Sequence, residues 1–238
     1  MKRDWKAWES ARERPDGRVV MRQRWEHLLF LHWPVPPSLL APTLPPGLEV
    51  DTFDGQGWLG VIPFWMRGVR PNGLPAVPGI SNFHELNLRT YVLDSEGRPG
   101  VWFYSLDCDQ ALAVAAARSL FHLPYQHARF YSQLRGVEMS YSCQRRGRPD
   151  EVWFRYPTLA LDQTAETGSL DFFLVERYRL FAWNSRSKRL RSGRVWHHPY
   201  RISPAPTCGE WDAVFRWNGF QPSPGPPAHA VYSAGVEV

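Results

Sequence analysis

The stretch that decides the fold is SNFHELNLRTYVL, residues 81–93. Side chains of a β-strand alternate between the two faces of a sheet, so this stretch divides into two stripes. One stripe is largely polar and contains Phe83, Glu85, Asn87, Arg89 and Tyr91. The other is largely apolar and contains His84, Leu86, Leu88, Thr90 and Val92. The pattern predicts a strand that packs its apolar stripe on a core, and it leaves open whether the polar stripe faces solvent or lines a site.

Strand-like segments surround this stretch. Asp54-Gly55 is a hairpin signal, so it is predicted to join residues 48–53 to residues 57–69. A turn at 94–97 is predicted to lead into a strand at 98–107. Further strands are expected at 24–35, 128–134, 137–144, 151–157, 176–184, 190–197 and 229–236.

Helices are few in this pattern. The clearest is predicted within 107–123, with Asp107 as its N-cap, Gln110 completing a capping pair and Pro124 ending it. Shorter helical segments are expected at 4–14, 38–41, 169–176 and 209–217. Antiparallel strands with one good helix predict a mainly β fold, a barrel or sandwich with a few helices packed outside.

The length fits one large domain or two small ones, and single β domains of this size are common. The chain has 238 residues, of which 43% are apolar and 21% charged, enough for a packed core. We expect residues 1–17 to form a tail or short helix and residues 18–238 a single domain. No apolar run approaches the roughly 18 residues of a membrane span, and the charged N-terminus lacks a signal-peptide core. The expected location is the cytoplasm.

The cysteines and histidines give no metal or disulfide pattern. Cys108, Cys143 and Cys208 are widely spaced and odd in number. Neighbours on a strand point to opposite faces, so His197 and His198 are poorly placed to share a metal. We therefore expect neither a metal nor a cofactor.

The net charge of +5 comes almost entirely from arginine. The densest basic runs are Arg145, Arg146, Arg148 and Lys188, Arg189, Arg191, Arg194. Both runs are predicted to lie in hairpin connections, which favours solvated loops over a nucleic-acid interface.

Four segments together resemble the DUF2071 (YqjF-like) family. They are GLEVDTFDGQGWLGVIPFWMRGVRP at 47–71, HELNLRTYV at 84–92, GVWFYSLDCDQALAVAAARSLFHLPYQHARF at 100–130 and SLDFFLVERYRLFAWN at 169–184. That family is similar in fold to acetoacetate decarboxylase. The resemblance implies an antiparallel β-barrel or cone with peripheral helices.

The decarboxylase relatives use a Schiff-base lysine, whose pKa is lowered by an adjacent cation, as in acetoacetate decarboxylase itself. Their lysine pair lies in a segment of the form G-R-E-x-x-G-F-P-K-K-x-A. The corresponding stretch here is ARSLFHLPYQHA, in which Tyr125 and Gln126 occupy the lysine positions. The remaining lysines lie in the N-terminal tail and a basic turn, so Schiff-base decarboxylation is not expected.

A second family segment, Tyr-x-Glu facing the cavity, resembles Phe83-His84-Glu85. The resemblance makes Glu85 a candidate acid/base, provided that burial raises its pKa. Tyr125, at the lysine position, becomes a candidate hydrogen-bond donor, and Arg89 could grip a carboxylate. Further candidate ligand-binding residues are Asn87, Tyr91, Gln126 and His127. A solvated strand face or a buried Glu–Arg pair stays open as the alternative.

Three functions follow in order of preference. The first is binding of a small organic acid or carbonyl compound in the barrel without covalent chemistry. The second is a lyase, hydratase or isomerase acting on an oxo acid through Glu85 and Tyr125. The third is docking of nucleic acid or protein on the arginine loops. The sequence leaves open the role of Glu176-Arg177-Tyr178, and also whether the chain forms a homo-oligomer.

Overall fold

The structure is a computed structural model that describes residues 5–116, 121–159, 161, 163–222 and 225–238. The strands are β1 (Met21–Val35), β2 (Leu48–Val50), β3 (Gly57–Pro71), β4 (Phe83–Asp94), β5 (Pro99–Cys108), β6 (Tyr125–Arg135), β7 (Glu138–Arg145), β8 (Val152–Pro157), β9 (Arg179–Asn184), β10 (Arg189–Arg194), β11 (Ser203–Pro204), β12 (Cys208–Glu210) and β13 (His229–Glu237). The helices are α1 (Lys6–Ser10), α2 (Pro37–Leu40), the 3-10 turn η1 (Ala41–Thr43), α3 (Ala111–Ala116), α4 (Leu170–Val175) and α5 (Asp212–Trp217).

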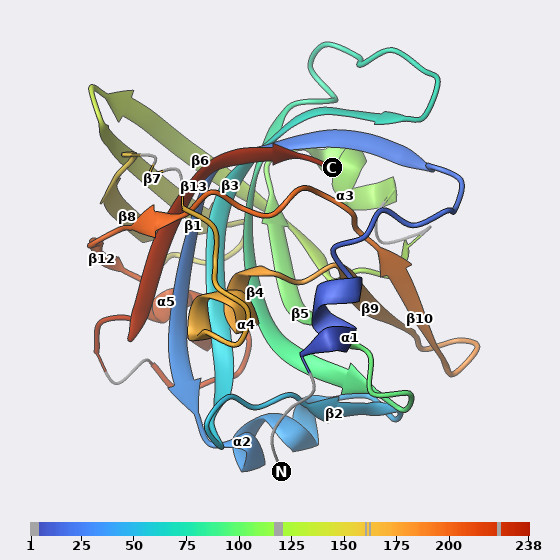
Figure 1. Ribbon diagram of the computed structural model, residues 1–238. Helices are drawn as coiled ribbons and strands as arrows, with labels where there is room; N and C mark the ends of the chain where they lie inside the picture. Colours follow the sequence, from blue (N-terminus) through green and yellow to red (C-terminus); the bar gives the residue numbers. More distant parts are fainter. Residues whose placement is uncertain (1–4, 117–120, 160, 162, 223–224) are drawn as a thin grey trace.

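The strands join in one 13-stranded sheet that curls into a half-barrel (Figure 1). Its main path runs β11-β13-β1-β3-β4-β5-β6-β7-β8-β12, with β2, β9 and β10 attached beside it. The predicted mainly β fold with a few helices is confirmed. The form differs in two respects. The pairings of the described strands make an open path rather than a closed barrel, and β5 pairs in parallel with both β6 and β9.

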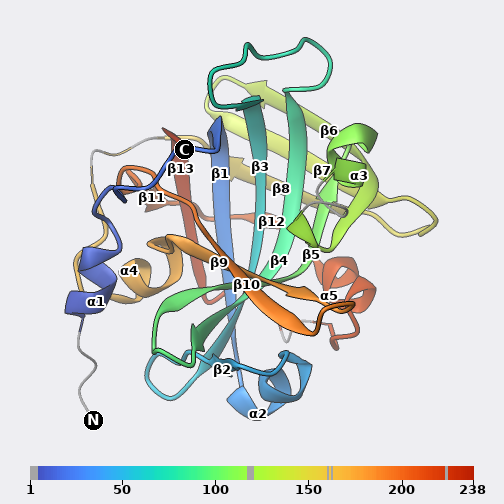
Figure 2. The ribbon, with the colours of Figure 1, turned by 90° about the vertical axis from the view of Figure 1, so that its right-hand side faces the viewer.

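Strand β4 is covered on both faces. The residues of its polar stripe face a core built largely from β1, β3 and α4, which includes Phe30, Ile62 and Phe173. Its Leu86 and Leu88 pack instead into a second core, with the β6–β8 sheet and α5. Figure 2 shows α4 and α5 on opposite sides of the long central strands. The predicted burial of the apolar stripe is confirmed, and the solvated alternative for the polar stripe is wrong.

At Asp54-Gly55 the predicted turn forms, but the predicted pairing of the two flanking strands does not. Both residues have positive φ, 50° and 77°, and the turn closes through the Phe53↔Gln56 bridge. However, β2 pairs with β4 rather than with β3. Strand β3 already has β1 on one edge and β4 on the other, so it has no edge left for β2.

The helix predicted within 107–123 starts later than expected. Strand β5 continues to Cys108, and Asp107 is a buried ion-pair partner of Arg145 rather than an N-cap. Helix α3 begins at Ala111, and residues 117–120 of the prediction lie outside the described residues. The expected segments at 4–14, 38–41, 169–176 and 209–217 are present as the shorter helices α1, α2, α4 and α5.

The basic runs are separate. Arg146 and Arg148 lie in the turn between β7 and β8, as predicted, whereas Arg145 is buried, because it neutralises Asp107. The second run lies on the β9–β10 hairpin, on the opposite side of the molecule in Figure 1. No helix of the described residues has the length and apolar character that a membrane crossing requires.

Candidate functional site

The centre of the candidate site is the Glu85 carboxyl group. It is 3% exposed, and the Tyr125 hydroxyl donates to its Oε2 at 2.8 Å. Burial raises the pKa of Glu85 to about 7, while hydrogen bonds from Tyr125 and Asn87 oppose that rise. Burial and the neighbouring carboxyl also hold the pKa of Tyr125 well above its usual range, so its hydroxyl stays a donor. The pair can hold or release a proton near neutral pH.

The sheet order explains why these two residues meet. Strand β5 lies between β4 and β6, so it pairs with both. Glu85 lies opposite Cys108 of β5, and Tyr125 lies opposite Leu106, two residues away. The Glu85 and Tyr125 side chains therefore lie on the same face of the sheet, and they meet across β5.

Arg89 lies on the same polar stripe of β4, four residues from Glu85. Its Nε donates to the Tyr91 hydroxyl at 3.3 Å and its Nη2 to the Leu174 carbonyl at 3.1 Å, which ties β4 to α4. In the described residues no hydrogen bond or ion pair joins Arg89 to Glu85, which agrees with the spacing of residues four apart on a strand. Asn87 lies between Arg89 and Glu85, and its buried Oδ1 has no partner among the described residues.

A chain of hydrogen bonds leads from Arg89 toward the surface. Tyr91 Oη lies 2.7 Å from His32 Nε2, His32 Nδ1 lies 2.8 Å from His229 Nδ1, and His229 Nε2 lies 2.8 Å from Asp171 Oδ1. The Asp171 side chain is 39% exposed.

The Asp171 carboxylate fixes the direction of this chain, because it can only accept. His229 therefore donates from Nε2 to Asp171, and its Nδ1 accepts from His32 Nδ1. His32 Nε2 is then an acceptor for the Tyr91 hydroxyl, which itself accepts from Arg89. Burial, with the nearby His229 and Arg89, keeps the pKa of His32 well below its usual value.

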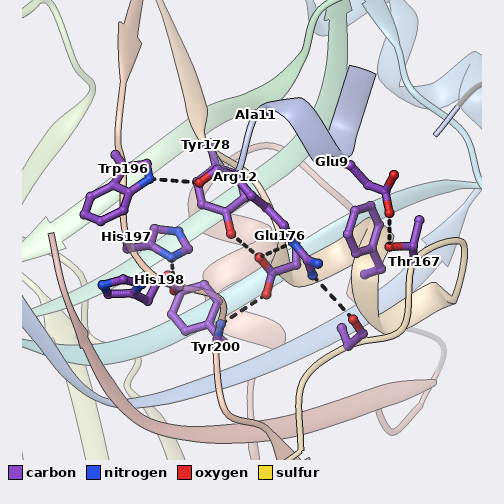
Figure 3. A network of polar contacts seen from close by, with 12 residues as sticks. Glu9, Ala11, Arg12, Thr167, Glu176, Tyr178, Trp196, His197, His198 and Tyr200 are labelled. Carbon is purple, nitrogen blue, oxygen red and sulfur yellow. Dashed lines mark hydrogen bonds and ion pairs between the residues drawn. The ribbon is translucent and has the colours of Figure 1, made fainter. Parts of the chain in front are cut away.

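A third polar group is centred on Glu176 and includes Arg12 from the N-terminal segment (Figure 3). The Glu176 carboxylate, fully buried, accepts from the Tyr178 hydroxyl and from the Tyr200 N–H, and lies 3.5 Å from Arg12 Nε. Burial raises the pKa of Glu176 against the effects of these partners. Trp196 Nε1 donates to the Arg12 carbonyl at 2.9 Å, so the segment after β10 and the N-terminal segment are held together.

His197 packs against the aromatic rings of this group. It stacks on Tyr178 with ring centroids 4.5 Å apart and contacts Tyr200 at 4.4 Å. Burial, assisted by the charge of Arg89, lowers the pKa of His197 to about 4. The ring is therefore neutral at physiological pH, and its Nε2 has no partner among the described residues. His198 is exposed, so the adjacent histidines point apart as predicted.

The structure brings together most of the predicted site residues. Glu85, Asn87 and Tyr125 form one contact group, and Arg89 and Tyr91 another. Gln126 and His127 are half-buried, and Gln126 points away from the face on which Tyr125 meets Glu85.

Sequence reasoning missed His32, His229 and Asp171. His32 and His229 are 197 positions apart and meet only because β13 pairs with β1, so no local signal joins them. The Glu176-Arg177-Tyr178 segment was recognisable, and alternation correctly put Glu176 and Tyr178 together.

The sequence of this chain is similar to that of a known protein family. A family model described as DUF2071, an uncharacterized conserved protein, matches residues 22–237. The chain belongs to the DUF2071 family. It is similar to the uncharacterized protein YqjF of Bacillus subtilis (strain 168), with 42% identity over 192 residues, covering 80% of this chain and 78% of YqjF.

Solved structures similar to this DUF2071 protein share its fold. The acetoacetate decarboxylase of Legionella pneumophila superposes with a TM-score of 0.61 at 12% identity, covering 92% of this chain and 84% of the decarboxylase. The enduracididine biosynthesis enzyme MppR, in complex with the condensation product of pyruvate and imidazole 4-carboxaldehyde, gives 0.61 at 15% identity, covering 91% and 86%. At these identities the likeness shows the fold alone. The family assignment made from the four segments is confirmed.

Proposed function

We propose that this protein binds a small organic acid carrying a carbonyl or hydroxyl group on the polar stripe of β4, without forming a Schiff base. The carboxylate would pair with the free N–H groups of Arg89, which uses only Nε and one Nη2 hydrogen in its described bonds. The observation that carries the proposal is the unpartnered Oδ1 of Asn87 between Arg89 and Glu85, because a buried acceptor without a donor costs free energy until a ligand or water supplies one.

The ends of the stripe suit different parts of such a ligand. Arg89 remains charged, whereas burial raises the pKa of Glu85 to about 7. A neutral Glu85 carboxyl can donate a hydrogen bond to a carbonyl oxygen, and the amide of Asn87 can accept from a hydroxyl. A 2-oxo or 3-oxo acid presents a carboxylate and a carbonyl oxygen, and its enol form presents the hydroxyl that the Asn87 amide oxygen can accept from. The MppR structure named above supports this ligand class, since the product bound there derives from pyruvate.

Binding can be tested with pyruvate and acetoacetate by calorimetry. We expect Arg89→Met to weaken binding at least about tenfold, because a charge-assisted pair contributes about 1.5–3 kcal/mol. The matched control is Arg155→Met on β8, whose side chain is 54% exposed and far from the stripe, and which should bind as the unchanged protein does. Equal affinities for all three proteins, or no binding of either acid, would contradict the proposal.

Acid/base catalysis on the bound acid is the second candidate function. It is favoured by the 2.8 Å contact between Tyr125 and a carboxyl group that titrates near neutrality. We expect the methyl protons of pyruvate to exchange with D2O faster in the presence of the protein, as followed by NMR. Glu85→Gln should remove this acceleration, and Tyr125→Phe should reduce it. Acceleration that survives Glu85→Gln would assign the base to another residue.

Borohydride trapping separates this chemistry from that of a Schiff-base decarboxylase. Tyr125 and Gln126 occupy the lysine positions of the family segment, Lys6 lies in α1 and Lys188 in the exposed β9–β10 turn. Treatment with acetoacetate and borohydride should leave the intact mass unchanged. An adduct on any lysine would overturn the non-covalent mode of binding.

A further inference from the structure

The opposite face of β4 carries a constellation that the proposed function does not use. His84 Nδ1 lies 2.7 Å from Asp109 Oδ2, and His84 Nε2 lies 2.8 Å from Ser132 Oγ. Asp109 Oδ1 also accepts the backbone N–H of His84 at 2.9 Å. A nucleophile within hydrogen-bond reach of a base, itself oriented by a third group, is the geometric signature of an activated serine.

Three neighbouring segments hold these residues. His84 lies near the start of β4, Asp109 directly follows β5, and Ser132 lies on β6, which is the next strand of the sheet. The imidazole ring is fixed by stacking on Phe130, with centroids 5.6 Å apart and planes 11° from parallel. Orientation therefore comes from packing as well as from hydrogen bonds.

The partners determine the tautomer of the neutral His84 ring. A carboxylate can only accept, so the Asp109 contact places the ring proton on Nδ1. Nε2 of the neutral ring is then a lone pair directed at the Ser132 hydroxyl, which must donate to it. This is the arrangement in which histidine acts as a general base toward serine.

The group is accessible to a substrate. The side chains of His84 and Asp109 are 22% and 31% exposed, and Ser132 is half-buried. Phe130 and Leu134 flank Ser132 on the same face of β6, and Leu134 is 42% exposed. Trp65 completes an apolar border at 5.9 Å from the imidazole ring. This border suits an apolar acyl group.

We propose that Ser132, His84 and Asp109 form an esterase-type site that accepts esters of short apolar carboxylic acids. Ser132 Oγ forms a bond to the acyl carbon as its proton passes to His84 Nε2. The C–O bond to the alcohol then breaks, and His84 returns the proton to the departing oxygen. Water, deprotonated by the same imidazole, hydrolyses the acyl-serine and releases the acid.

We place the oxyanion of the intermediate at the edge of β6 that faces away from β7. Beyond His127, β6 pairs with β7 along one edge, and no strand of the described chain pairs with its other edge. Every second residue of a strand directs its N–H to one edge, so this part of β6 has backbone donors that no strand uses.

Labelling with a fluorophosphonate tests the site without knowledge of its natural substrate. Ser132 Oγ should displace fluoride from phosphorus, giving a single adduct whose position is read by peptide mass spectrometry. We expect no adduct in Ser132→Ala, and labelling slowed at least about 100-fold in His84→Gln, in line with the usual contribution of a general base. Hydrolysis of p-nitrophenyl butyrate should fall in parallel.

Ser140→Ala is the matched control, because Ser140 lies on the neighbouring strand β7 opposite Gln133 and belongs to no part of the constellation. Its labelling should equal that of the unchanged protein. Asp109→Asn keeps the size of the side chain, so slowed labelling in a protein with an unchanged circular dichroism spectrum separates positioning of the base from loss of folding. An absence of adduct, an adduct on another residue, or equal labelling of His84→Gln would overturn the proposal.

Discussion

Replacing Asp107 with alanine is expected to destabilise the protein by about 3–5 kcal/mol, the usual result of stranding a buried charge. Asp107 is fully buried and receives two parallel hydrogen bonds from Arg145, Nε to Oδ1 at 2.6 Å and Nη2 to Oδ2 at 2.7 Å. Arg145 also lies over the Trp217 ring at 4.9 Å. Without the carboxylate, the guanidinium stays in a site from which water is excluded.

The stability lost in Asp107→Ala reflects the cost of leaving the Arg145 charge buried without its partner. It does not measure the net contribution of the ion pair to stability. Burial raises the pKa of Asp107 even though Arg145 opposes this, so desolvation offsets much of the attraction. Asp107→Leu combined with Arg145→Met should therefore recover most of the stability lost in Asp107→Ala. A double variant as unstable as the single one would show that the pair itself is strongly stabilising.

Urea unfolding provides the measurement, with a surface pair as the control. Glu138 lies 3.8 Å from Arg155, and both side chains are more than half exposed. Glu138→Ala should cost less than about 1 kcal/mol, because water and salt screen exposed pairs. Equal losses in Glu138→Ala and Asp107→Ala would contradict the assigned role of burial.

Much of the fold and part of the site were predictable from local patterns. Period-2 alternation in 81–93 was sufficient to place Glu85, Asn87, Arg89 and Tyr91 on one face. It could not reveal whether that face is covered, because α4, which covers it, lies about 80 residues further along the chain. The contact between Glu85 and Tyr125 was expected only from the family resemblance, since spacing says nothing about pairing across β5.

The incorrect predictions have a common cause. Each of them depends on pairing between segments that are distant in the sequence. Asp107 has the residue type of an N-cap, yet the partner that holds it in β5 is Arg145, 38 positions later. Residues 48–50 precede the hairpin signal at Asp54-Gly55, yet they pair with β4, because β3 is already paired on both edges. The triad-like group of His84, Asp109 and Ser132 likewise depends on the order of β4, β5 and β6 in the sheet. Local propensity cannot determine such an order.

Glu85→Gln is expected to make the protein relatively more stable as the pH rises. The folded-state pKa of Glu85 is about 7, above the ordinary value of 4.5. Protonated Glu85 therefore contributes stability that is fully present below the ordinary pKa and is lost as the pH rises through the folded-state value. A difference of this size corresponds to about 3 kcal/mol, and glutamine, which does not ionise, avoids that loss.

Unfolding free energies of both proteins, measured from about pH 4.5 to about pH 8, should therefore diverge by about 3 kcal/mol in favour of Glu85→Gln. Comparing the variant with the unchanged protein at each pH removes the titration of all other groups. Glu49→Gln on β2 is the control, because its side chain is exposed and its stability curve should run parallel to that of the unchanged protein. A parallel curve for Glu85→Gln would mean that Glu85 ionises in the folded protein without cost, and it would remove the proton carrier on which the proposed acid/base chemistry depends.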